Sequence, residues 1–298
     1  MQRLLMMFLS FVMMVLTSIA PILGDGRANE LLAQARAALG GESRLASVKA
    51  LSAHGTVARA VGEMQVSGEM DLALALPDKM LRSDSMSPMG DATIVISTGI
   101  NGDTLLRHTS TIGGGPNMVI RTPPPPAHGS DAETQALRAS RAELVRLSLS
   151  LMLASPASMP LEFSYGGEAE AEDGKADVLE VKGPSSFVAR LFLDKTTHRP
   201  LMLAYKGVPA RMVVSSSTTH GEPPDPAKLE RDAKERADKQ TAPQMVDINM
   251  VFDDYNQVDG VWLPHHMTRS VDGKTNEEWT FKTMKVNQAL PPDTFTAK

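Results

Sequence analysis

Cysteine is absent from this sequence of 298 residues. Its absence excludes disulfides, thiolate metal ligands, cysteine nucleophiles and lipid attachment to a cysteine behind a leader. Aromatic residues are few, at 4% of the chain. Positive charge is not in excess either, because the formal net charge is −5 and Lys and Arg form no obvious cluster. Since phosphate backbones bind to basic surfaces, we expect no nucleic-acid partner.

Motifs that would indicate an enzyme are missing or weak. Residues 113–116 are glycine-rich, but the Lys-Ser/Thr pair of a phosphate-binding loop does not follow them. His265 and His266 are adjacent, and neighbours on a strand point to opposite faces, so they are poorly placed to share a metal ion. The acidic stretch 253–259 lacks the spacing of a calcium loop. We expect no catalytic residues, no metal and no cofactor, and a hydrolase with an unrecognised site is the alternative.

Residues 1–24 have the pattern of a secretory signal peptide. Arg3 gives a positive start, residues 4–16 are almost all apolar, and small and polar residues follow up to Ala20. A membrane anchor is the alternative, because the apolar character continues to Leu23. Cleavage after Ala20 or Ala28 would fit. We expect an exported, periplasmic protein that has no membrane-spanning segment once the leader is removed.

Two segments of the mature chain have a helical pattern. In residues 29–41, Asn29 can cap a helix whose apolar residues share one face, and a short helical turn over 42–48 can follow. Residues 131–153 predict the main internal helix. Its second half is apolar nearly all round, which requires cover on most sides. Residues 147–151 also alternate, so a strand is the alternative there.

Most of the remaining chain predicts antiparallel strands. The predicted segments are 50–60, 66–76, 79–85, 92–98, 161–169, 176–182, 187–194, 199–206, 244–255, 261–271 and 275–286. Asn101-Gly102 can supply the two positive-φ residues of a type I′ hairpin, and Asp-Gly pairs at 259–260 and 272–273 mark further turns. Repeated local hairpins indicate an antiparallel sheet rather than βαβ units. The expected class is therefore α+β, mostly antiparallel β.

Two stretches interrupt the strand pattern. Residues 113–130 form a proline-rich loop, with four prolines at 123–126. Residues 221–243 predict a charged helical insertion, in which Glu230 can pair with Lys234 one turn later. We expect residues 25–298 to be a single domain that carries these two additions.

Several predicted strands offer a wide apolar face. These faces, with one tryptophan, define a candidate ligand cavity: Met70, Leu72, Leu74, Leu76, Ile94, Ile96, Ile248, Met250, Phe252 and Trp262. Methionine is flexible and polarizable, which suits apolar partners of variable shape. Either these faces pack fully on the helix at 131–153, or a curved sheet leaves its interior incompletely filled.

Short motifs near both ends resemble those of the outer-membrane lipoprotein-sorting-protein-like family, which has the LolA/LolB fold. They are Ala38-Leu39-Gly40-Gly41, Leu76-Pro77-Asp78-Lys79, Phe252-Asp253-Asp254-Tyr255, Val258-Asp259-Gly260-Val261-Trp262-Leu263-Pro264-His265, Glu278-Trp279 and Pro291-Pro292-Asp293-Thr294-Phe295. The resemblance implies a curved, incomplete β-barrel (half-barrel) with helices packed in its concave side. It also implies a periplasmic protein with a hydrophobic cavity for acyl chains.

The residues and the resemblance together favour a periplasmic binding protein. Its expected ligand is an acyl chain, a lipid or a lipidated protein. The alternative is an envelope sensor or scaffold domain that binds another protein and has no lipid ligand. Whether the interior of the sheet is filled or hollow would separate these hypotheses.

Overall fold

The computed structural model describes residues 24–61, 64–89, 92–113, 127, 129–171, 174–208 and 244–296. Nearly all of the predicted leader, most of the proline-rich loop and the charged insertion 221–243 lie outside the described residues. What the sequence predicts for those segments stays a prediction.

The described residues form a β-rich domain with three helices. The helices are α1 (Gly24–Ala38), α2 (Glu42–Ser47) and α3 (Asp131–Met152). The strands are β1 (Ala50–Val61), β2 (Met64–Ala75), β3 (Lys79–Met89), β4 (Ala92–Asn101), β5 (Thr104–Ile112), β6 (Glu162–Ala171), β7 (Gly174–Gly183), β8 (Phe187–Asp194), β9 (Pro200–Gly207), β10 (Val246–Val258), β11 (Val261–Val271) and β12 (Lys274–Val286).

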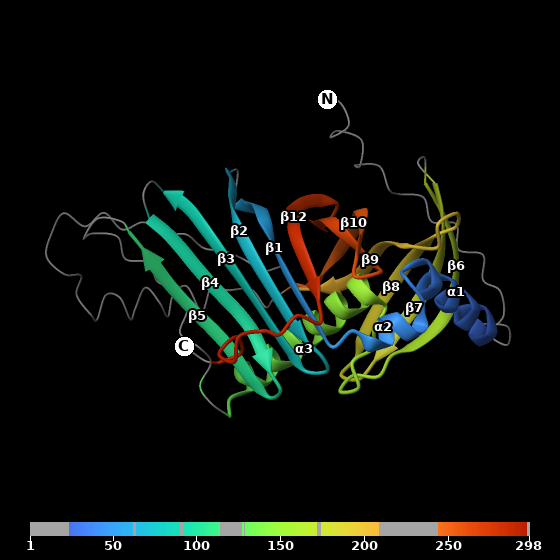
Figure 1. Cartoon of the computed structure of the whole chain (residues 1–298), viewed down its shortest axis with the longest axis horizontal. Coiled ribbons are helices and arrows are strands. Elements are labelled where there is room, and N and C mark those ends of the chain that lie inside the picture. Colours follow the sequence, from blue (N-terminus) through green and yellow to red (C-terminus); the bar gives the residue numbers. More distant parts are fainter. Residues whose placement is uncertain are drawn as a thin grey trace, which may run out of the picture.

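All twelve strands belong to one antiparallel sheet in the order β5-β4-β3-β2-β1-β12-β11-β10-β9-β8-β7-β6. β5 and β6 follow each other along the chain but form opposite edges, so the sheet does not close. The connection between them must cross the whole sheet, and α3 makes this crossing on the concave side, in contact with β4, β5, β9 and β11 (Figure 1). The predicted α+β class and the half-barrel with helices in its concave side are confirmed.

The register places a continuous apolar surface on the concave side. Successive inward positions of β2 lie opposite those of β1 and β3, as the pairs Met70–Gly55 and Met70–Asp84 illustrate. Inward side chains of both halves of the sheet join α1, α2 and α3 in one buried cluster. A second, smaller cluster of Ala176, Val178, Phe192 and Ala204 lies on the opposite face of β7–β9. The core therefore lies mainly on the concave side, where the helices pack on the sheet.

The first helix is longer than its sequence pattern predicts. α1 begins at Gly24, and Asn29 is an exposed residue inside the helix, so its predicted role as the cap is wrong. The predicted apolar face is confirmed, because Leu31, Leu32 and Ala35 are all buried. Ala28, which is fully buried, extends that face toward the N-terminus and gives the extra turn a packing surface.

The main internal helix is confirmed, and the alternative of a strand at 147–151 is wrong. Ser130 caps α3 by accepting a hydrogen bond from the Glu133 backbone N–H, and the Glu133 carboxylate accepts one from the Gly129 N–H. This reciprocal pair fixes where the helix starts. The second half of α3 is buried, so packing on the sheet decides its conformation over the local alternation.

The predicted hairpins are present, with one difference in turn type. Asp259-Gly260 and Asp272-Gly273 have positive φ at both positions, as a type I′ turn requires. At the β4–β5 hairpin, however, Asn101 pairs with Thr104 inside the ladder, and Gly102 is the central residue with positive φ. Gly102-Asp103 thus form the turn with glycine first, the arrangement of type II′, and the predicted type I′ turn at Asn101-Gly102 is wrong.

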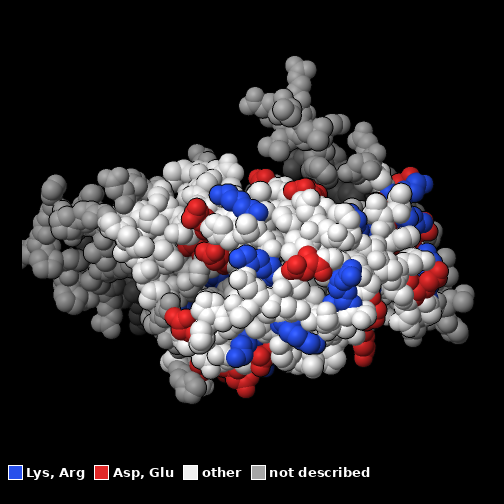
Figure 2. All heavy atoms as spheres, in the orientation of Figure 1, with Lys and Arg blue, Asp and Glu red and all other residues white. Residues whose placement is uncertain are grey.

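Charge is mixed on the outer surface that Figure 2 presents. Lys and Arg side chains alternate there with Asp and Glu, and neither sign dominates that face (Figure 2). Among the helices that the structure describes, none has the length and apolar character needed to cross a membrane.

Candidate functional site

A row of charged residues occupies inward positions at the centre of the sheet. Glu277 of β12 lies between Arg59 of β1 and Arg269 of β11 in the strand register. Arg82 and Asp84 take inward positions on β3, opposite Leu72 and Met70. The strands that carry these residues are distant in sequence, and the pairing of β1 with β12 brings them together.

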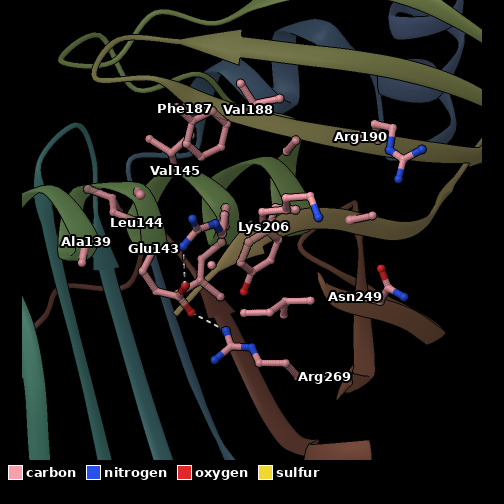
Figure 3. Close-up of a pocket in the computed structure, with 18 of the residues that line it drawn as sticks. Ala139, Glu143, Leu144, Val145, Phe187, Val188, Arg190, Lys206, Asn249 and Arg269 are labelled. Atoms are coloured by element: carbon pink, nitrogen blue, oxygen red, sulfur yellow. Dashed lines mark hydrogen bonds and ion pairs between the residues drawn. The ribbon is translucent and has the colours of Figure 1, made fainter. Parts of the chain in front are cut away.

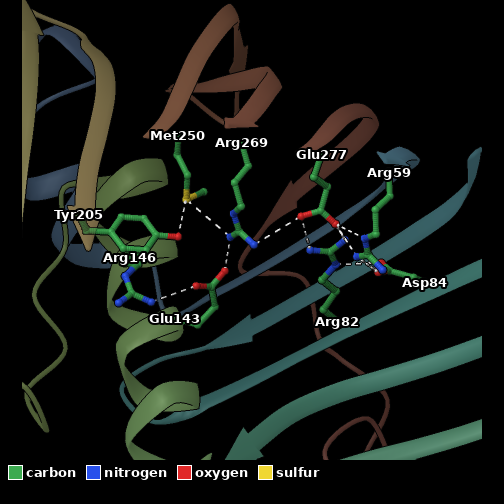
Figure 4. A network of polar contacts seen from close by, with 9 residues as sticks. All are labelled: Arg59, Arg82, Asp84, Glu143, Arg146, Tyr205, Met250, Arg269 and Glu277. Atoms are coloured by element: carbon green, nitrogen blue, oxygen red, sulfur yellow. Dashed lines mark hydrogen bonds and ion pairs between the residues drawn. The ribbon is translucent and has the colours of Figure 1, made fainter. Parts of the chain in front are cut away.

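The two carboxylates of this row are each shared by arginines. Asp84 accepts hydrogen bonds from Arg59 Nη2 and from Arg82 Nε, both at 2.8 Å. Glu277 accepts from Arg59 Nε at 3.0 Å, from Arg82 Nη1 at 3.3 Å and from Arg269 Nη1 at 3.4 Å. Only 3% of the Glu277 side chain is exposed, so its charge depends on these three guanidinium groups (Figure 4).

Helix α3 joins the row through Glu143 and Arg146. Glu143 accepts hydrogen bonds from Arg269 Nη2 and, at 3.3 Å, from Arg146 Nη1. The Arg146 guanidinium lies 3.9 Å from the centre of the Tyr205 ring, a cation–π contact. We call Arg59, Arg82, Asp84, Glu143, Arg146, Arg269 and Glu277 the arginine–carboxylate network; Figure 4 shows how its members face one another.

Neighbouring charges favour the ionised forms of Glu277, Glu143 and Arg269. Burial alone would raise the pKa of Glu277, but Arg82, Arg269 and Arg59 outweigh it and lower that pKa strongly. The pKa of Glu143 is also lowered, because Arg269 and Arg146 overcome the effect of burial. The pKa of the Arg269 guanidinium is raised, because attraction to Glu143 and Glu277 outweighs desolvation, which by itself would lower it. Counted at formal charges, the four arginines and three carboxylates of the network sum to one net positive charge.

A large open space adjoins the network. Its volume, counted over both faces of the sheet, is about 2250 Å³. Its lining residues lie on both faces of the sheet, since Val188, Arg190 and Ala204 belong to the outward side of β8 and β9. The part of this space on the concave side lies between α3 and the sheet, and only this part is called the hollow below.

The walls of the hollow are partly apolar and partly basic. Val145 of α3 faces Phe187 at one side, while Glu143 reaches toward Arg269 at the other (Figure 3). Further apolar lining comes from Met80, Ile96, Ala142, Ile248 and Val271. This side of the half-barrel is therefore neither filled completely by its own side chains nor uniformly apolar.

The predicted cavity residues take three kinds of position. Ile96 and Ile248 line the hollow. Met70, Leu72, Leu74, Ile94, Met250 and Phe252 are buried, with at most 4% exposure. Leu76 and Trp262 are partly buried against the core, and the Arg199 guanidinium lies 4.2 Å from the Trp262 ring. Contact of these ten residues with a ligand stays a prediction.

The adjacent histidines do not face one site. His265 Nδ1 contacts the Leu263 carbonyl, whereas His266 contacts Asp253 with one ring nitrogen and Glu278 with the other, at 2.8 and 2.7 Å. The hydrogen bond with Asp253 is the main cause that raises the pKa of His266 to about 9. Each ring nitrogen of His266 faces one carboxylate, an arrangement that favours the protonated imidazole.

Analysis of the sequence missed the arginine–carboxylate network. A signal was present, since Glu277 alternates with Trp279 and Phe281, and Arg82 and Asp84 lie between Met80 and Met86. A charged side chain at an inward position of an apolar face needs partners when buried. Those partners come from strands that no local pattern connects, so the sequence alone could not assemble the set.

No protein-family model matches this sequence, and neither does any curated protein. Several solved structures are similar in fold, each at a TM-score of 0.46. An outer membrane lipoprotein-sorting protein domain of Vibrio parahaemolyticus is 12% identical, over 91% of this chain and 97% of its own. A LolA superfamily protein of Nitrosomonas europaea is 8% identical and a DUF1329 family protein of Desulfovibrio piger 9%, each over 90% of this chain and 97% of its own. The names of the Vibrio parahaemolyticus and Nitrosomonas europaea proteins are those of the group that the sequence motifs resemble.

Proposed function

We propose that this protein binds an apolar chain in the periplasm, namely an acyl chain, a lipid or a lipidated segment of a protein. The observation that carries the proposal is the hollow between α3 and the concave face, where Ile96, Phe187 and Val271 contribute apolar walls. Ligand pockets are typically concave and mostly apolar, with a few placed polar groups. Among the described strands β5 is an edge, and its Arg107 lines the hollow, so a long ligand could enter along that edge without unfolding of the core.

The proposed periplasmic location rests on the sequence and not on the geometry of the site. Residues 1–24 have the pattern of an export signal, and the motifs near both ends resemble a periplasmic family. A carrier or binder of this kind needs no catalytic group, and we propose no reaction.

The test is to fill the hollow with a side chain of the protein itself. Ala139 lies on the exposed half of α3 and lines the hollow, so Ala139→Trp places an indole there without disturbing the buried half of the helix (Figure 3). We expect this variant to bind a fluorescent fatty acid at least about tenfold more weakly than the parent protein. Lipid carried through purification, measured by native mass spectrometry, should fall in parallel.

Ala132→Trp is the matched control. Ala132 is two turns before Ala139 on the same face of α3, it is exposed, and it does not line the hollow. Its variant should bind as the parent does. Purified parent protein that carries no lipid and takes up no fluorescent fatty acid would contradict the proposal and favour a sensor or scaffold domain.

A further inference from the structure

The arginine–carboxylate network is one anion short on the side that faces the hollow. Arg59 and Arg82 share both Asp84 and Glu277, so the β1–β3 side of the network has a carboxylate for each guanidinium. Arg269 and Arg146 instead depend mainly on the single carboxylate of Glu143. The net positive charge therefore resides at the Arg146–Arg269 end.

Unpaired donors occur at the same end. Arg146 Nε and Arg269 Nε are buried and have no acceptor among the residues that the structure describes. Buried polar atoms are normally satisfied, and each unsatisfied donor destabilises the fold. This end of the network therefore holds more donors than the Glu143 carboxylate satisfies.

Both guanidinium groups border the hollow and lie next to its apolar walls. Arg146 is flanked by Tyr205 and Phe187, with its guanidinium 3.9 and 5.8 Å from the two ring centres. About one seventh of each arginine side chain remains exposed, 16% for Arg146 and 14% for Arg269. An amphiphile could therefore place an anionic group on the arginines and its hydrocarbon along the apolar wall.

We infer that the ligand of the hollow is an anionic amphiphile, whose acidic head group binds Arg146 and Arg269 on the side that borders the hollow, next to the Glu143 carboxylate that already bridges them. The inference rests on the proposed function and specifies its ligand class. Guanidinium groups recognise carboxylate and phosphate by charge-assisted hydrogen bonds, and both head groups share this chemistry. Bound there, one negative charge neutralises the network.

The test compares three ligands with one hydrocarbon chain. Lauric acid, dodecyl phosphate and dodecanol compete with a fluorescent fatty-acid probe for the full-length mature protein. We expect at least one of the two acids to bind about 10- to 100-fold more tightly than the alcohol, the range for hydrogen bonds to charged groups. Their relative affinities tell whether carboxylate or phosphate is preferred.

Two variants assign that preference to the arginines. Arg146→Gln and, separately, Arg269→Gln each leave the network electrically neutral, and each should abolish the preference for acid while dodecanol binds as before. Unchanged dodecanol binding and circular dichroism show that a variant is folded. Lys282→Gln, an equal loss of charge at an exposed position of β12 that does not line the hollow, should keep the preference.

The outcomes separate this inference from the proposed function. Equal binding of acids and alcohol, or a preference that survives both arginine variants, overturns the inference and leaves an apolar-chain binder. Failure of all three ligands to bind overturns both.

Discussion

Glu277 shows how much one residue can determine at the centre of this sheet. Its carboxylate is almost fully buried and serves three arginines from β1, β3 and β11. Removing one partner of a buried ion pair costs more than the pair contributes to stability, because the remaining charges lose their compensation. The residue therefore stabilises the fold mainly by preventing repulsion among the arginines around it.

Substitution of Glu277 should reveal this role as a pH-dependent loss. We expect Glu277→Gln to lower the free energy of unfolding by about 3–5 kcal/mol at pH 7. Because folding lowers the pKa of Glu277, its stabilisation is present above the unfolded value of about 4.3 and is lost as pH falls below it. Urea unfolding of parent and variant from pH 7 to 3 should show the difference shrinking in acid.

An exposed carboxylate provides the comparison. Glu69→Gln on the outward side of β2 should change stability by no more than about 0.5 kcal/mol at any of these pH values. A Glu277→Gln protein as stable as the parent at pH 7 would show that the arginines do not need this carboxylate.

At the scale of elements, α3 determines whether a hollow exists. Its second half is buried and fills the concave side, whereas its first half is largely exposed and leaves room beside Ala139 and Ala142. The helix is held at both ends by different means. Ser130 and Glu133 cap its start, and packing of Leu147, Leu149 and Leu151 fixes its end.

The cap is the part of α3 that can be tested alone. Ser130→Ala should lower the free energy of unfolding by about 0.5–2 kcal/mol, because the Glu133 N–H loses its acceptor. Ser140→Ala, inside the same helix, should be neutral or slightly stabilising because alanine favours helix. Thermal unfolding followed by circular dichroism measures both, and equal effects of the two substitutions would argue against the cap.

At the scale of the whole molecule, the open sheet makes stability uneven. β1 and β12 lie near the centre and are each paired on both sides, whereas β5 and β6 are the edges among the strands that the structure describes. Unpaired strand edges expose backbone donors and open locally at lower free energy than central strands. Entry of a ligand into the hollow should therefore begin at an edge.

Amide hydrogen exchange tests this expectation. Amides of β1, β2 and β12 should exchange at least about tenfold more slowly than those of β5, because their opening approaches global unfolding. The same experiment with a bound fatty acid should slow exchange in β4, β5 and the first half of α3. Uniform protection across the sheet would contradict the expectation that the edge strands open at lower free energy than the central strands.

The sequence by itself determined the elements and their antiparallel arrangement. Alternation of period two, Asp-Gly turns and the apolar run of α3 are local signals, because side-chain direction and φ are set within a few residues. They specified most strands, the main helix and, with the family motifs, the half-barrel. They could not place the exact start of α1 or the type of the β4–β5 turn, where packing and register decide.

Only the tertiary structure decided the candidate site. Arg59 and Glu277 are separated by 218 residues, and they meet because β12 returns beside β1. Most residues of the predicted apolar faces are buried in the core, while charged residues at other inward positions border the hollow. Charges act over distances in space and not along the chain, so the network exists only once the sheet has been assembled.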